Sequence, residues 1–183
     1  MADIQRRLAA LASGRPGRPP RSSGRPVDAA AVRELEAYLG APLPAAVALF
    51  LTEIGLGVGP YGGFLAPEKI RYEVQLDRDD CADDGIPVPD LAAPFPITAQ
   101  DVRARPYPVR PLPLDGAVRI GQQGCGRWTV LALTGELAGT VWDLDGEWAE
   151  RTEWRPAAHW PEEPPASGPV HFLDWVERWL DRQ

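Results

Sequence analysis

The sequence predicts an α+β fold: a mainly antiparallel sheet with an N-terminal αα-hairpin and a C-terminal helix packed against it. Three observations predict it. Two helical patterns lie between residues 28 and 55, β-rich apolar runs separated by turns lie between 117 and 154, and a Trp-containing helical pattern closes the chain. The 183 residues fit one domain, and the seven Trp residues supply apolar area for a core.

The first 26 residues are expected to form a flexible arm ahead of a domain over residues 27–183. Within the arm, residues 4–11 can form a short, weakly anchored helix, because Ile4, Leu8 and Leu11 fall on one face. Arg, Pro and Gly make up most of residues 13–26, a composition typical of a linker. A basic arm that binds a partner or nucleic acid is the alternative interpretation.

Two short helices with chemically marked ends follow the arm. Asp28 can cap a helix over residues 29–39, and Gly40 can supply its left-handed stop. A second helix is expected to begin near Pro44 and to end at Gly55. The inward positions have helical spacing: Val32, Leu35, Leu39, Leu43, Val47, Phe50, Leu51 and Ile54. These two helices form the predicted αα-hairpin.

Residues 55–63 contain five Gly, which raises the question of a phosphate-binding loop. Such loops follow a strand and precede a helix, and the P-loop also needs a G-K-[ST] sequence. Here a helix precedes the glycines and apolar residues follow them. The segment is therefore interpreted as a tight connection into the sheet.

Residues 70–113 carry few periodic cues, and the most distinctive part is the acidic run at residues 77–85. EF-hand calcium ligation is excluded, because Ala82 and Leu91 occupy positions that need oxygen ligands. We expect an exposed acidic loop, either a solvated surface or a contact for a partner. Its candidate partner-binding residues are Asp77, Asp79, Asp80, Asp83 and Asp84.

The second half of the chain predicts an antiparallel meander. Residues 117–120 form a short strand candidate and 121–126 a turn, after which residues 128–133, 139–144 and 147–154 form three strands. Trp142, Trp148 and Trp154 recur along the meander, and core packing is the first expectation for them. An exposed aromatic patch is the alternative, which makes Trp148 a further candidate partner-binding residue.

The closing helix has the clearest pattern in the chain. Its apolar residues follow the spacing i, i+3, i+4, i+7, i+8 and are Phe172, Trp175, Val176, Trp179 and Leu180. Charged residues occupy the opposite face. We expect this helix to cap the sheet.

The chain offers little material for catalysis, and we expect no enzymatic activity, cofactor or metal site. It has two His, His159 and His171, and no G-x-S-x-G sequence. Cys125 lies between two glycines and is the one plausible nucleophile. Cys81 and Cys125 lack metal-ligand or C-x-x-C spacing and are expected to be reduced thiols.

Hydropathy and charge narrow the expected location and partners. No apolar run reaches the roughly 18 residues that span a bilayer, and no secretory signal is apparent, so a cytoplasmic protein without membrane contact is expected. The net charge of −7 hides an asymmetry, because residues 1–26 hold six Arg and one Asp while residues 27–183 hold 13 basic and 25 acidic groups. The acidic body disfavours nucleic acid and favours a basic protein partner.

The order of several short sequences resembles the SUKH superfamily over residues 27–183. The resemblance rests on Glu36, Leu39, Gly40, Leu43, Pro44, Phe50, Leu51, Gly62, Gly63, Ile120, Gly121, Gly124, Gly126, Gly139, Val141, Trp142, Phe172, Leu173 and Trp175. It implies an α+β fold without catalytic residues. It also implies a bacterial immunity protein that binds and neutralises a basic toxin, such as a nuclease. A regulatory or scaffold module of cell-wall or signalling regulation is the alternative that the same superfamily implies.

Overall fold

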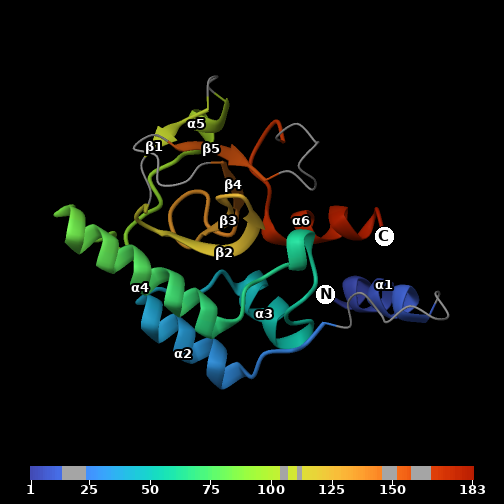
Figure 1. Ribbon diagram of the computed structural model, residues 1–183. Helices are drawn as coiled ribbons and strands as arrows, with labels where there is room; N and C mark the ends of the chain where they lie inside the picture. The colour runs from blue at the N-terminus through green and yellow to red at the C-terminus, as the bar shows by residue number, and fades with distance from the viewer. Residues whose placement is uncertain (14–23, 104–106, 111–112, 146–151, 158–165) are drawn as a thin grey trace.

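The computed structural model describes residues 1–13, 24–103, 107–110, 113–145, 152–157 and 166–183 (Figure 1). The helices and strands follow in this order: α1 Ala2–Ser13, α2 Ala29–Leu39, α3 Ala45–Glu53, the 3-10 turn η1 Pro60–Gly62, α4 Pro67–Asp84, α5 Ala99–Arg103, β1 Val109–Arg110, β2 Ala117–Gly124, β3 Arg127–Ala132, β4 Val141–Asp145, β5 Thr152–Pro156 and α6 Phe172–Leu180.

The five strands form one sheet in the order β1-β5-β4-β3-β2, and all neighbours are antiparallel. Helices α2, α3 and α4 lie on one side of the sheet and α5 on the other, while α6 lies beside α3 (Figure 1). The predicted α+β fold with an antiparallel sheet and a C-terminal helix is confirmed. The sheet is larger than predicted, because β1 and the second half of β2 were not expected.

The αα-hairpin is closed by side chains and backbone that the sequence pattern identified. The Asp28 carboxylate accepts a hydrogen bond of 2.6 Å from the Ala30 N–H, as expected of an N-cap. Gly40 ends α2 with a φ of 72°, a conformation that costs other residues energy. The loop is then fixed because the Glu36 carboxylate accepts a hydrogen bond of 2.9 Å from the Leu43 N–H.

The sheet separates two apolar clusters, since successive strand residues point to opposite faces. The larger cluster joins the helices to one face, and at its centre Phe172 packs edge-on against Phe50 at 5.0 Å between ring centroids. The smaller cluster lies on the other face, where the Phe95 ring is 5.5 Å from both Trp142 and Trp154. The expectation of core packing is confirmed for Trp142 and Trp154; Trp148 lies outside the described residues.

One expectation about the N-terminal segment, the weak anchoring of its helix, is wrong, and residues 14–23 of the predicted flexible arm lie outside the described residues. Helix α1 was expected to be weakly anchored, but Ile4 and Leu8 are buried in the larger cluster, and Arg7 pairs with Asp181 beyond α6 at 2.7 Å. Near the end of the predicted arm, Arg25 forms two backbone hydrogen bonds with Leu56, of 3.0 and 2.9 Å. Burial of the apolar face of α1 stabilises the folded state, although the composition of the following segment is typical of a flexible arm.

The predicted turn at residues 121–126 is also mostly wrong. Strand β2 continues to Gly124 through two irregularities in its pairing with β3, and a two-residue turn of Cys125 and Gly126 connects the strands. Both turn residues have positive φ, 49° and 74°, as primed hairpin turns require. Gly has low β propensity and the two Gln residues are polar, which explains why the apolar pattern ended this strand too early.

No helix among the described residues combines the length and the apolar character needed to cross a membrane.

The buried position of Trp175 predicts a large effect of its removal. The side chain is 1% exposed, so Trp175→Ala should lower the free energy of unfolding by about 3 to 5 kcal/mol through lost burial and a cavity. Leu49→Ala is the control, because Leu49 is largely exposed and should change it by less than about 0.5 kcal/mol. Urea unfolding measures both values; equal stability of the two variants would show that α6 is not part of the core.

Candidate functional site

The acidic run that was expected to be a loop is the second half of helix α4, so that expectation is wrong. The helix buries a stripe at helical spacing that includes Ile70, Val74 and Cys81. The same stripe also contains the carboxylates Glu73 and Asp77, both of which are buried. The helical period was hidden because two of its inward positions are occupied by charged residues.

Helix α4 ends in a defined cap at Gly85, which has a φ of 65°. The Ile86 N–H donates to the Cys81 carbonyl at 2.9 Å, and the Gly85 N–H donates to the Ala82 carbonyl at 3.3 Å. This pattern is a Schellman motif, which satisfies carbonyls that the helix leaves free. The cap therefore fixes where the acidic helix ends and where the following chain departs.

A cluster of charged side chains connects α4 to β2, the strand at one edge of the sheet. The Arg119 guanidinium lies 2.7 Å from the Asp77 carboxylate and 3.6 Å from the Glu73 carboxylate. Lys69 approaches the other Glu73 oxygen at 2.7 Å. The Arg119, Glu73 and Asp77 side chains are almost completely buried. Neither carboxylate could be buried in this position without a cation, because isolated buried charges are strongly disfavoured.

Arg119 is itself held by an aromatic ring on the adjacent strand. Its guanidinium carbon lies 4.7 Å from the centre of the Trp128 ring, within the range of a cation–π interaction. A planar guanidinium can face a ring and reach two carboxylates at once. Arg119 thereby fixes the position of α4 beside β2. The position of α4 in turn determines where its exposed residues lie.

Burial changes the acidity of Asp77. Its desolvation is the largest cause and raises the pKa of Asp77 to about 6, and the neighbouring carboxylates Glu73 and Asp80 act in the same direction. Arg119 opposes the change but does not cancel it. The ion pair with Arg119 is therefore present near neutral pH and is lost as Asp77 becomes protonated in mildly acidic solution.

The other four candidate aspartates lie towards the outside of α4. Asp79, Asp83 and Asp84 are exposed and Asp80 is partly exposed. Gln75 donates a hydrogen bond of 2.7 Å to Asp79, while Asp80, Asp83 and Asp84 form no ion pair with another described residue. The structure thus divides the predicted group: Asp77 is a buried structural residue, and the other four form a surface that we call the acidic face.

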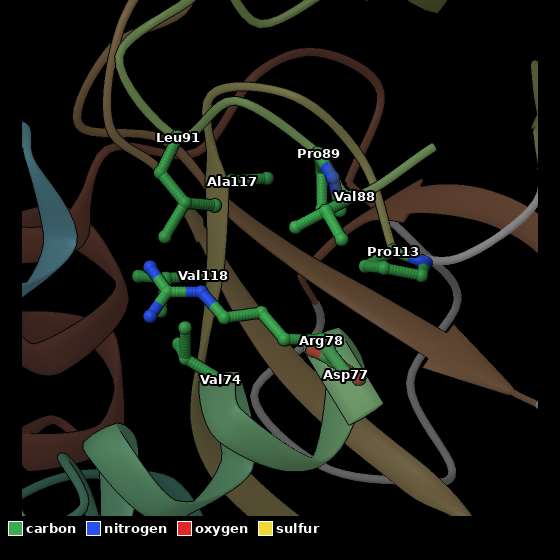
Figure 2. Close-up of a pocket in the computed structure, with 9 residues that line it drawn as sticks. All are labelled: Val74, Asp77, Arg78, Val88, Pro89, Leu91, Pro113, Ala117 and Val118. Atoms are coloured by element: carbon green, nitrogen blue, oxygen red, sulfur yellow. The ribbon is translucent and has the colours of Figure 1, made fainter. Parts of the chain in front are cut away.

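A small apolar pocket lies between α4, the start of β2 and the segment that follows the helix (Figure 2). Its volume is about 20 Å³, which is room for roughly one water molecule. Val74, Leu91 and Val118 are among its walls, and Asp77 and Arg78 are its charged residues. Sequence reasoning missed this pocket, because its walls come from three separate segments.

The remaining candidates for function are separated in the fold or lie outside the described residues. Trp148 and His159 lie in undescribed segments. Cys125 is exposed in the β2–β3 turn, whereas His171 pairs with Thr140 near the opposite end of β3. A strand of this length spans roughly 16 to 20 Å, so Cys125 and His171 do not form a catalytic pair. No group of three metal-ligating side chains occurs among the residues that the structure describes.

The fold and the site define a class: an α+β domain whose edge strand holds an acidic helix through a buried arginine. No protein-family model matches the chain, and neither a curated protein nor a solved structure matches it. Function is therefore inferred from the chemistry of this surface.

The raised pKa of Asp77 predicts how its contribution to stability depends on pH. The folded state binds the Asp77 proton more tightly than the unfolded state, so this contribution is fully present below about pH 4 and is lost as the pH rises through about 6. Between pH 4 and 7 the stability of the wild type relative to Asp77→Asn should fall by about 1 to 3 kcal/mol. Urea unfolding of both proteins at each pH measures this difference.

Asp101→Asn is the matched control with the opposite sign. Hydrogen bonds of 2.8 Å from the Thr98 N–H and hydroxyl lower the pKa of Asp101. The stability that Asp101 contributes is therefore present at neutral pH and is lost as the pH falls through its folded pKa. Parallel pH profiles for the two variants would contradict the assigned shifts.

Removal of Arg119 should have a larger effect than removal of either carboxylate's charge. Arg119→Met leaves Glu73 and Asp77 buried with Lys69 as the remaining cation of the cluster, and the free energy of unfolding should fall by about 3 to 5 kcal/mol. Arg178→Met on α6 replaces an exposed arginine and should change it by less than about 0.5 kcal/mol. Similar losses in both variants would show that the buried cluster is not an anchor.

Proposed function

We propose that the protein is a non-enzymatic binding protein that neutralises a basic protein partner, a toxin, by covering it with the acidic face of α4. The single observation that carries the proposal is the arrangement of Asp79, Asp80, Asp83 and Asp84 on the last two turns of this helix, with no basic residue in the last turn.

The acidic face is unfavourable for the helix that carries it. The C-terminal end of a helix has a partial negative charge, and each carboxylate there costs about 0.3 to 1 kcal/mol. The aspartates also repel one another across one or two turns. A cationic partner would relieve both effects, so binding to a basic surface gains energy that the free protein lacks.

The acidic face is also rigidly presented. Ile70, Val74 and Cys81 are buried on the opposite side of α4, and Arg119 holds the helix from β2. The C-terminal end of α4 extends past the edge of the sheet, where a partner has access to it (Figure 1). A preformed surface loses little conformational entropy on binding, which favours affinity.

Charge and sequence resemblance support the same proposal. The acidic excess of residues 27–183 gives the body a field that attracts cations over distances near the Debye length. Nucleases present basic residues to bind phosphates, and carboxylates on an inhibitor can take the place of those phosphates. The resemblance to the SUKH superfamily adds that relatives without catalytic residues act as immunity proteins.

Removal of the charges of the acidic face should abolish toxin binding and growth rescue. The variant Asp79→Asn, Asp80→Asn, Asp83→Asn, Asp84→Asn keeps the shape of each side chain and removes the charges that attract the partner. Toxin candidates encoded beside the gene are co-expressed with each protein, and growth and pull-down are measured. The wild type should bind and restore growth, with weaker binding as salt increases, and the variant should do neither.

The matched control removes the same charge from other exposed positions. The control carries four substitutions at exposed acidic residues, one on each of α2, α3, the β3–β4 connection and α6. They are Glu34→Gln, Glu53→Gln, Glu136→Gln and Asp174→Asn. This control should retain binding and growth rescue. Equal loss in both variants would show that net charge acts without a specific surface, and a wild type that neither binds nor rescues would refute the proposal. Binding without rescue would favour a scaffold role.

A further inference from the structure

The outward side of α4 carries an exposed aromatic ring as well as aspartates. We propose that this side binds an arginine-containing basic segment of the partner, with one guanidinium stacked on the Tyr72 ring and further basic residues paired with the aspartates. This inference rests on the proposed function and specifies the recognition element: arginine rather than any cation, selected by Tyr72.

The spacing of five residues along α4 places them on one side of the helix. Successive helical residues are rotated by about 100°, so positions i, i+4, i+7, i+8 and i+11 share a face that is about 16 Å long. We call this face the Tyr72 surface; it consists of Tyr72, Leu76, Asp79, Asp80 and Asp83. It holds three of the four residues of the acidic face, and the buried apolar residues of α4 point to the other side of the helix.

Tyr72 gives this surface an apolar part. Among the large apolar side chains that the structure describes, Tyr72 is the most exposed, at 54%. Leu76, one turn later, is half-buried. Tyrosine is common among the residues that contribute most to binding, because its ring buries a large area and loses little conformational entropy. The surface therefore combines an apolar part with the acidic part that follows it along the helix.

The Tyr72 ring already contacts one cation of its own helix. The Lys69 ammonium lies 4.3 Å from the centre of the ring. Glu73 pairs with that ammonium at 2.7 Å and balances its charge. An aromatic ring attracts a cation at either of its two faces. Lys69 occupies one of them, and the exposure of Tyr72 leaves the ring accessible to a second cation.

The protein contains two examples of the contact that we propose for the partner. The Arg78 guanidinium carbon lies 5.0 Å from the centre of the Tyr38 ring, and that of Arg119 lies 4.7 Å from the Trp128 ring. A guanidinium is planar and more weakly hydrated than an ammonium, so it can stack on a ring while its N–H groups reach carboxylates. A segment that contains arginines therefore gains from both parts of the Tyr72 surface.

The acidic part of the surface keeps its charge available for a partner. Asp80 and Asp83 form no ion pair with another described residue. Arg78, which lies on the same turns of α4, is directed to Tyr38 on α2. Charge complementarity therefore assigns a basic occupant to this side of the helix.

Capped pentapeptides of arginine, lysine and glutamate test the surface without the natural partner. An extended residue spans about 3.3 Å, so five residues match the length of about 16 Å. The full ¹⁵N-labelled protein is titrated with each peptide at equal ionic strength, and amide chemical shifts are followed. The arginine peptide should shift the signals of Tyr72, Leu76 and Asp80 and bind at least about threefold more tightly than the lysine peptide. The glutamate peptide should bind most weakly.

Two tyrosine variants form the matched pair. Tyr72→Leu keeps an apolar side chain and removes the ring, and Tyr61→Leu makes the same change on η1, where the tyrosine is 36% exposed. The amide spectra verify the fold of each. Tyr72→Leu should weaken binding of the arginine peptide by about threefold and change binding of the lysine peptide by less than about twofold. Tyr61→Leu should leave both affinities unchanged.

Tyr72→Phe keeps the ring and should therefore keep the preference for arginine. Equal binding of the arginine and lysine peptides to the wild type would overturn the inference. An unchanged preference in Tyr72→Leu, or the same loss in Tyr61→Leu, would also overturn it.

The outcomes separate this inference from the proposed function. An arginine preference that depends on Tyr72, in a protein that does not rescue growth, would retain the Tyr72 surface and reject the immunity role. Equal growth rescue by the wild type and Tyr72→Leu, without an arginine preference, would retain the role and reject the surface. Tighter binding of the glutamate peptide than of the basic peptides would contradict the assigned charge of the partner.

Discussion

Arg119 is the residue on which the arrangement of the candidate surface depends. It lies on β2, contacts the Trp128 ring on β3, and pairs with two buried carboxylates of α4. Because those carboxylates occupy inward positions of the helix, a cation from the sheet offsets part of the cost of burying them when α4 packs beside the sheet. The orientation of α4 then decides which of its aspartates face water.

The buried cluster and the acidic face have opposite consequences for the same type of residue. Asp77 is surrounded by protein, so its carboxylate loses hydration and its pKa rises to about 6. Asp83 and Asp84, two turns further along, remain in water at a helix end that disfavours negative charge. Asp77 helps to position the helix through its contact with Arg119. Asp83 and Asp84 provide negative charge that a basic partner would neutralise.

Elements whose signals are local could be predicted from the sequence. The cap at Asp28, the stop at Gly40 and the apolar spacing from Phe172 to Leu180 each depend on neighbours within a few residues, and the structure confirms them. The sequence could also place the aspartates in one acidic group. It could not recognise α4, since Glu73 and Asp77 interrupt the apolar stripe, nor the strand character of Gln122 and Gln123, which depends on pairing with β3.

Which acidic residues are buried, and where the pocket lies, depends on contacts between segments that are far apart in the sequence. Asp77 and Arg119 are 42 positions apart, and the pocket combines three segments that are distant in sequence. No local pattern records that a charged residue will meet its counter-ion across the fold. The number of acidic residues in this segment can therefore be read from the sequence. Which of them are buried beside Arg119 and which are exposed depends on packing, because burial is a property of the whole fold.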